Sequence, residues 1–198
     1  FTDPYYTIDG VSRGFDLYYR NVDPTSLSVG NYRTSSQGFG LRHGLPIAED
    51  DSISLGLSFD HTSITTFQDS PQRYIDFVNL FGESTTTLLG TVGWARDRRD
   101  SFLYPTSGSY HRFLGELSLP GGELRYYRAQ YQYQKFWSLT RDFTLMFNGE
   151  IGIGDGYNAK PLPFFKNFFA GGIGSVRGYE QSSLGPRDVL STGQVSDD

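Results

Sequence analysis

The 198-residue sequence contains no cysteine, which excludes disulfide bonds, thiolate metal ligands and cysteine nucleophiles. It has no apolar run of about 18 residues, the length that a membrane-spanning helix needs, and its mean hydropathy is −0.42. The net charge of −5 disfavours a nucleic-acid partner. These absences leave open a protein that crosses a membrane with strands, because a barrel strand needs only about 9–11 residues and exposes one face to lipid.

Glycine and aromatic residues are abundant. The chain holds 24 Gly, 14 Tyr and 16 Phe, a composition that suits many strands joined by turns, with rings available for the membrane–water boundary. The first residues do not form a signal peptide, and we expect Phe1–Pro4 to lie inside a longer protein.

Seven segments alternate apolar and polar residues with a period of two, a strand signal that a helix does not reproduce. In the clearest one, Tyr127, Tyr131 and Trp137 share a face opposite Arg128 and Gln132. The predicted strands are Val11–Arg20, Gly38–Ile47, Ser52–His61, Thr86–Arg96, Ser109–Leu119, Tyr127–Leu139 and Phe143–Ile153.

The connections between these strands alternate in length. Turns at 48–51, 105–108 and 140–142 are short, whereas 21–37, 67–85 and the segment from 155 onward are long. Short turns at one end and long loops at the other are typical of membrane barrels.

One long loop is predicted to hold a short surface helix over Ser70–Phe81. Ser70 suits its N-cap, Pro71 its first turn and Gly82 its end.

Alternation alone fits a soluble antiparallel sheet equally well. Two features favour a barrel: the polar faces carry Arg, Gln, Glu and Asp along whole strands, and Tyr and Trp gather near strand ends, as Tyr19 and Trp137 do. Single-chain bacterial barrels have an even number of strands, about 8 or more. The predicted fold is therefore all-β: an antiparallel transmembrane β-barrel, present as an incomplete segment of about seven strands.

Residues 171–179, Gly-Gly-Ile-Gly-Ser-Val-Arg-Gly-Tyr, place the cation of Arg177 among glycines. In this setting Val176–Tyr179 resembles the sixth-loop signature of the BamA family of outer-membrane β-barrel assembly factors. Other segments resemble the same family, in the family's order: Phe1–Tyr5 with Asp9–Ser12, Asp100 with Pro105–Gly108, and Pro163–Gly172.

The resemblance implies a division into central barrel strands over 1–154 and a long extracellular loop over 155–198 that folds into the lumen. The tip of this loop is formed by Val176, Arg177, Gly178 and Tyr179. Gly171, Gly172 and Gly174 allow the backbone to fold tightly and approach a wall.

The family also implies a role for Arg177, whose guanidinium contacts acidic and aromatic residues of the inner wall. A planar, permanently charged fork suits a carboxylate. The acidic partner in the family lies beyond Asp198, and Glu150 is a possible secondary contact in the lumen.

The acidic and histidine residues indicate structural roles. Asp100, Pro105, Thr106 and Gly108 form a turn motif in which Asp caps the backbone and Gly takes a positive φ. The chain has no Gly-Lys-Ser/Thr phosphate loop, and its three histidines fall on three different strands. We therefore predict no catalytic residue, metal site or cofactor.

The resemblance implies assembly and insertion of β-barrel proteins in the outer membrane of Gram-negative bacteria. The implied partners are outer-membrane lipids, nascent barrel clients and, through POTRA domains that this chain lacks, accessory lipoproteins. The first and last barrel strands are also expected to lie outside the chain. The alternatives are a two-partner secretion or TamA-type translocation barrel, a passive porin-like channel and a soluble β-sandwich recognition module.

Overall fold

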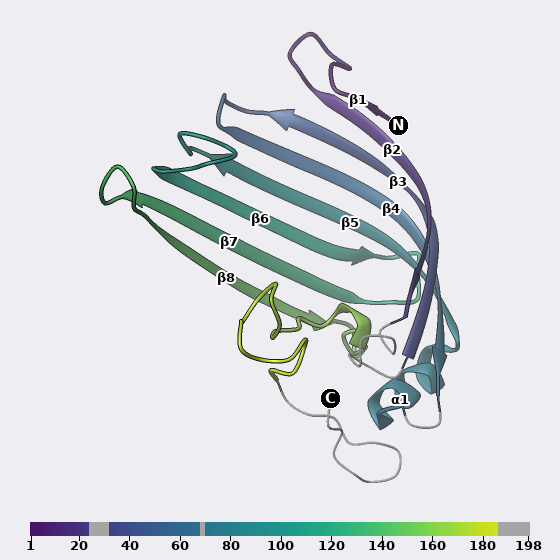
Figure 1. Cartoon of the computed structure of the whole chain (residues 1–198). Coiled ribbons are helices and arrows are strands. Elements are labelled where there is room, and N and C mark those ends of the chain that lie inside the picture. The colour runs from purple at the N-terminus through teal and green to yellow at the C-terminus, as the bar shows by residue number, and fades with distance from the viewer. Residues whose placement is uncertain (24–31, 68–69, 186–198) are drawn as a thin grey trace.

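The computed structural model describes residues 1–23, 32–67 and 70–185, and contains one open, curved antiparallel sheet (Figure 1). Its eight strands follow one another in chain order, each hydrogen-bonded to the next. Among these residues, no helix is long and apolar enough to cross a membrane. The strands are β1 (Thr2–Asp3), β2 (Ser12–Val22), β3 (Tyr32–Pro46), β4 (Asp51–Thr66), β5 (Ser84–Asp97), β6 (Gly108–Leu119), β7 (Tyr126–Ser138) and β8 (Thr144–Gly156).

The structure confirms the all-β, incomplete-barrel fold and finds the seven predicted strands as β2 to β8. The very short β1 had no signal in the sequence, since it gains strand geometry only by pairing with β2. The largest boundary difference is in β3, which begins at Tyr32 and not at Gly38 because its first residues pair with the end of β4, as Tyr32 does with Thr66. Part of the predicted 21–37 loop is therefore strand, and 24–31 lies outside the described residues.

The two ends of the sheet differ in their connections. The predicted short turns join β3 to β4, β5 to β6 and β7 to β8 at one end (Figure 1). The opposite end carries helix α1 (Gln72–Phe81) and the chain that follows β8. The β6–β7 connection at this second end spans only 120–125, so the predicted alternation of loop lengths is incomplete.

The two faces of the sheet differ in polarity as predicted. Leu17 and Ile151 are 86% and 71% exposed on the convex face, and Phe147 is also exposed; no second layer formed by described residues covers them. Arg20, Asp60 and other even-numbered residues of β2, β3, β4, β6 and β7 line a cavity of about 470 Å³ on the concave face. A barrel wall with an apolar exterior accounts for this arrangement, because a soluble sandwich would bury its apolar face.

Phe136 and Met146 are apolar residues on the concave face at the short-turn end. Phe136 is buried there and pairs across the strands with Met146, close to the short-turn end. The two-residue period of a strand predicts that both side chains lie on the concave face, but it does not predict that they are apolar.

Buried apolar side chains gather at the long-loop end of the concave face. Helix α1 contributes Tyr74 and Phe77, the inward-facing positions of a stripe completed by Val78 and Phe81 at helical spacing. The other buried members come from the strands and the later loops: Tyr32, Ile64, Leu89, Leu124, Tyr126 and Phe164. We call this group the aromatic cluster.

The predicted helix is present, but its N-cap assignment was wrong. Pro71 occupies the N-cap position, and Ser70 Oγ instead accepts a hydrogen bond from the Phe67 N–H at 2.8 Å. Because Pro71 is the N-cap residue, Ser70 lies one position before it, and proline has no side-chain oxygen that could cap the first helical N–H groups. Gly82 ends the helix with φ +88°, as predicted.

Candidate functional site

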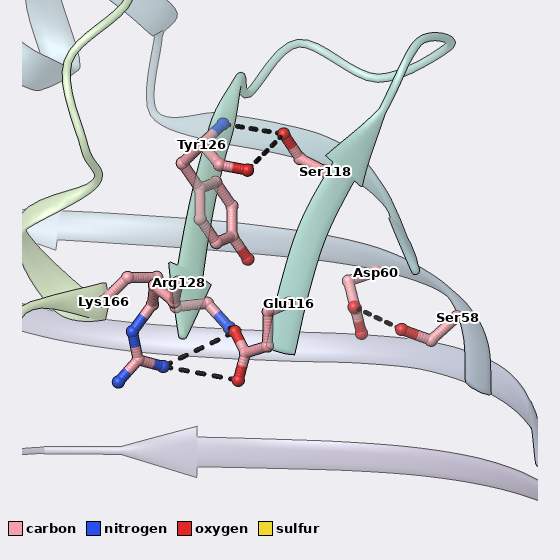
Figure 2. A network of polar contacts seen from close by, with 7 residues as sticks. All are labelled: Ser58, Asp60, Glu116, Ser118, Tyr126, Arg128 and Lys166. Atoms are coloured by element: carbon pink, nitrogen blue, oxygen red, sulfur yellow. Dashed lines mark hydrogen bonds and ion pairs between the residues drawn. The ribbon is translucent and has the colours of Figure 1, made fainter. Parts of the chain in front are cut away.

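The concave face carries an ion pair between neighbouring strands. Glu116 on β6 lies opposite Arg128 on β7, and Arg128 Nη1 is 3.3 Å and 3.4 Å from the two carboxylate oxygens (Figure 2). The two side chains are only 15% and 18% exposed, so water screens this pair less than a surface pair.

Next to this pair, one residue, Ser118, joins three parts of the chain. Ser118 Oγ accepts a hydrogen bond from the Tyr126 N–H at 2.7 Å and donates to the Tyr126 carbonyl oxygen at 3.2 Å (Figure 2). The Tyr157 hydroxyl, beyond β8, donates to the Ser118 carbonyl oxygen. These bonds tie the ends of β6 and β7 to the start of the chain that leaves β8.

A second acid lies on β4 of the same face. Asp60 is half-buried, and its Oδ2 accepts a hydrogen bond from Ser58 Oγ at 3.0 Å (Figure 2). Asp60, Glu116 and Arg128 line one cavity, so the concave face is charged as well as polar.

The chain after β8 returns onto the concave face. We call 157–169 the returning segment; it contains the short 3-10 helix η2 (Phe164–Lys166). The Phe164 ring stacks on Tyr74 of α1 with 4.1 Å between ring centroids, and Lys166 Nζ lies 3.6 Å from Glu116 Oε2. Farther on, the Phe168 ring lies 4.5 Å from the Arg128 guanidinium carbon.

Beyond the returning segment, 170–185 forms a loop closed on itself. The Leu184 N–H donates to the Ala170 carbonyl oxygen, and the Gly172 N–H donates to the Tyr179 carbonyl oxygen, both at 3.0 Å. Gly171 has φ +114°, and a Cβ there would collide with the Glu180 carbonyl oxygen. This glycine is therefore required by both backbone angle and space.

The other predicted glycines differ from one another. Gly172 has φ +88° with a side chain packed where its Cβ would lie, and Gly178 has φ +93°. Gly174 has an ordinary φ and no atom within 4 Å of a Cβ placed there, so no steric need for glycine is visible at this position.

Within the described residues, the side chains of the tip at Val176–Tyr179 are exposed. Arg177 makes no hydrogen bond or ion pair with any described residue. Glu150 is on the concave face as predicted, but its carboxylate accepts a hydrogen bond from Gln130 and does not contact Arg177. The role of these residues stays a prediction.

The predicted turn motif forms at the β5–β6 connection. The Asp100 carboxylate accepts hydrogen bonds from the Thr106 and Ser107 N–H groups at 2.9 Å and 3.1 Å, and from the Thr106 hydroxyl. Gly108 has φ +103°, and a Cβ there would collide with the Arg98 carbonyl oxygen. Hydrogen bonds from the Thr106 hydroxyl and the two backbone N–H groups hold the pKa of Asp100 well below its usual range.

We expect Asp100→Asn to loosen this turn, because the amide oxygen is a weaker acceptor than the carboxylate. Amide hydrogen exchange at Thr106 and Ser107 should then lose protection severalfold. Asp142→Asn is the matched control, since the Asp142 carboxylate makes no hydrogen bond within the part of the chain that the structure describes. Equal protection in both variants would contradict the capping role.

The same contacts predict an acid-dependent loss of order. Because folding lowers the Asp100 pKa, its contribution is present above the unfolded value of about 3.9 and is lost as the pH falls through the folded value. The protection factors of this turn should therefore stay constant from neutral pH to about pH 5 and fall in stronger acid. Asp100→Asn should lack that fall.

Sequence reasoning assigned no role to Glu116, Arg128, Lys166 or Phe168. Glu116 and Arg128 were recognised as residues of the polar face, but a strand pattern does not say which residue stands opposite which. The available signal was opposite charge on consecutive strands, which becomes specific once the register is known. Lys166 and Phe168 lie in Pro163–Gly172, a segment that resembles the family, but the segment gave no sign of their partners, which lie on strands earlier in the chain.

An open antiparallel sheet with an apolar convex face, a charged concave face and a segment that returns onto it is a wall segment of a membrane β-barrel. The chain belongs to the Omp85 superfamily: the family model described as the Omp85 superfamily domain matches residues 1–197. The predicted family resemblance is thereby confirmed.

Individual relatives agree with this assignment. The chain is 43% identical over 198 aligned residues to the outer membrane protein assembly factor BamA of Neisseria meningitidis serogroup B, covering 94% of this chain and 25% of that protein. It is 25% identical over 209 aligned residues to BamA of Nitratidesulfovibrio vulgaris, covering 100% of this chain and 24% of that protein. The chain thus spans about a quarter of the length of these relatives.

A solved structure shows the same fold. The crystal structure of BamA from Haemophilus ducreyi lacking POTRA domains 1–3 matches with a TM-score of 0.89 and 25% sequence identity. The match covers 95% of this chain and 38% of that one. The open sheet therefore corresponds to part of a larger barrel.

Proposed function

We propose that this chain is the central wall and loop segment of a protein that assembles and inserts β-barrel proteins into the outer membrane of Gram-negative bacteria. One observation carries the proposal: the likeness to the assembly factor BamA of Neisseria runs across 94% of the chain, both the wall and the segment that returns onto its concave face. A shared membrane exterior alone would also fit a passive channel.

In this proposal, 1–154 provides the wall and 155–198 forms the loop that occupies the lumen; 186–198 lies outside the described residues. The convex face contacts lipid through its exposed Leu, Ile and Phe side chains. The concave face holds the loop through charge and aromatic contacts. In this role the segment acts through the shape of its wall and the charges of its concave face, with no covalent step and no nucleotide.

The partners belong to the proposal as well. Nascent barrel proteins would be the clients, and accessory lipoproteins would bind parts of the full-length protein outside this chain. A client strand can add to an exposed strand edge through backbone hydrogen bonds. Such strand addition requires a wall that keeps its curvature while the client strand pairs with it. The continuous ladder from β2 to β8 provides such a wall.

The proposal is tested by Arg177→Ala in the full-length protein. Removing a guanidinium that pairs with a carboxylate inside a lumen should reduce the rate of client insertion into lipid vesicles about tenfold or more. Arg177→Lys should also be impaired, because an ammonium does not reproduce the two-pronged contact. Arg141→Ala is the control, since Arg141 is exposed in the short β7–β8 turn and makes no ion pair with a described residue.

Client insertion at the parent rate in Arg177→Ala would contradict the proposed role of the tip. Single-channel conductance separates a porin-like channel from an assembly barrel. A lumen occupied by the loop should conduct poorly, and an open channel would conduct steadily in the parent protein.

A further inference from the structure

The returning segment is attached to the concave face at two chemically different places. Phe164 anchors it in the aromatic cluster, which is part of the general packing under α1. Two residues farther on, Lys166 reaches a carboxylate of the wall. Hydrophobic packing accounts for the contact of Phe164 with the aromatic cluster. It does not account for the contact of Lys166 with a carboxylate.

Glu116 receives two cations from different parts of the chain. Arg128 comes from the adjacent strand β7, and Lys166 comes from a segment 50 positions later in the sequence, at 3.6 Å. The side chains of Glu116 and Lys166 are 15% and 28% exposed. Part-buried charges are screened less than surface charges, so this contact selects a partner of opposite charge, a selectivity that apolar packing lacks.

Arg128 continues the attachment toward the loop. Its guanidinium contacts Glu116 through Nη1 and lies over the Phe168 ring, while Nε makes no hydrogen bond with any described residue. The ring in turn rests on β8, because a Cβ at Gly152 would come within 2.7 Å of it. Glycine at this wall position leaves the space that the ring occupies.

We propose that Lys166, Glu116, Arg128 and Phe168 form a charged clamp that positions the loop carrying Val176–Tyr179 relative to the barrel wall. The clamp holds the chain at Phe168, immediately before the closed loop begins at Ala170. Lys166 is the positioning residue in this clamp. It is the link whose charge connects the loop to the wall, since Glu116 and Arg128 both belong to the wall itself.

The clamp acts on the loop because of chain geometry. With Phe168 held, the loop starts from a fixed point and a fixed direction, and its own hydrogen bonds between Ala170 and Leu184 keep it compact. Without the Lys166–Glu116 contact, the segment would keep only its ring contacts, those in the aromatic cluster and that of Phe168 against Arg128 and β8, and the chain after Phe164 would gain freedom to shift along the wall. The inference concerns where the loop lies, and it holds whether or not the protein assembles barrels.

The test measures the loop position in the full-length protein, with any other cysteine replaced. Nitroxide labels are attached at Ile173→Cys, an 86% exposed loop position, and at Gln134→Cys on the concave side of β7. Pulsed electron paramagnetic resonance spectroscopy then gives the distribution of distances between the two labels. For Lys166→Met, which keeps the length of the side chain and removes its charge, we expect the fraction outside the parent distribution to rise about fivefold.

Two further variants make the result specific. Lys166→Arg keeps the charge and should restore the parent distribution, which a purely packing role would not require. Arg112→Met removes a cation from the same strand as Glu116, one that pairs with no described acid, and should leave the distribution unchanged. Heat-modifiable gel migration verifies that the wall is intact in each variant.

If the distribution of label distances in Lys166→Met superimposed on the parent distribution, the clamp would be contradicted. It would also be contradicted if Arg112→Met changed the distribution as much as Lys166→Met does. Client insertion measured on the same samples is a separate readout. A displaced loop with normal insertion would support the clamp and count against the proposed function of the tip, whereas failed insertion in the parent would leave the clamp result standing.

Discussion

Replacing Ile151 with arginine is expected to destabilise the barrel by about 2–4 kcal/mol, the cost of a charged side chain on a lipid-facing position near the bilayer midplane. Ile151 lies near the middle of β8, is 71% exposed and pairs with Tyr131 on the convex face. Lipid cannot hydrate a guanidinium there, so the side chain must reach toward the membrane surface at a cost in free energy.

Asn148→Arg is the matched control for this substitution. Asn148 is exposed on the concave face of the same strand, where it accepts a hydrogen bond from Gln132 at 3.1 Å. An arginine there meets water and should change stability by less than about 0.5 kcal/mol. Urea unfolding of the full-length protein in lipid vesicles measures both variants. Equal stability of the two would contradict the assignment of the convex face to lipid.

The second large effect is expected at Phe164, where replacement by alanine should cost about 3–5 kcal/mol of local stability. The ring is 2% exposed and contacts Tyr32, Tyr74 and Phe77, so the substitution leaves a cavity at the centre of the aromatic cluster. The strand ladder does not depend on this ring. The loss should therefore appear as opening of α1 and the returning segment while the wall stays folded.

Amide hydrogen exchange resolves this local opening. Protection should fall in α1 for Phe164→Ala and remain unchanged along β7 and β8. Phe102→Ala is the control, since Phe102 is 78% exposed in the β5–β6 turn and its removal should change stability by less than about 0.5 kcal/mol. Parent-like protection of α1 in Phe164→Ala would show that the helix is held by other contacts.

The strands were predictable because their signal is local. In β7 and β8 every second residue is apolar over most of the strand, so the sequence alone assigns Tyr131 and Ile151 to one face and Gln132 and Glu150 to the other. The turn motif was predictable for the same reason, since the Asp100 cap and the positive φ of Gly108 involve residues within ten positions of each other.

The start of β3 and the cap of α1 were not predictable from local signals. Arg33–Ser36 has no apolar alternation and becomes strand because β4 extends along one side of it and the end of β2 along the other. Pro71 takes the N-cap position of the helix, and the Ser70 hydroxyl accepts a hydrogen bond from the Phe67 N–H in the preceding turn. Both outcomes were decided by neighbouring groups whose positions a sequence pattern does not contain.

The sequence by itself determined which residues of each strand share a face, where the turns fall and which superfamily motifs the chain carries. These features depend on neighbours within a few positions, and a period of two requires no knowledge of partners. Only the tertiary structure decided that Glu116 meets Arg128 and that Lys166 returns to the same carboxylate. Strand register and the path of a long connection bring these groups together, and both depend on the folding of the whole chain.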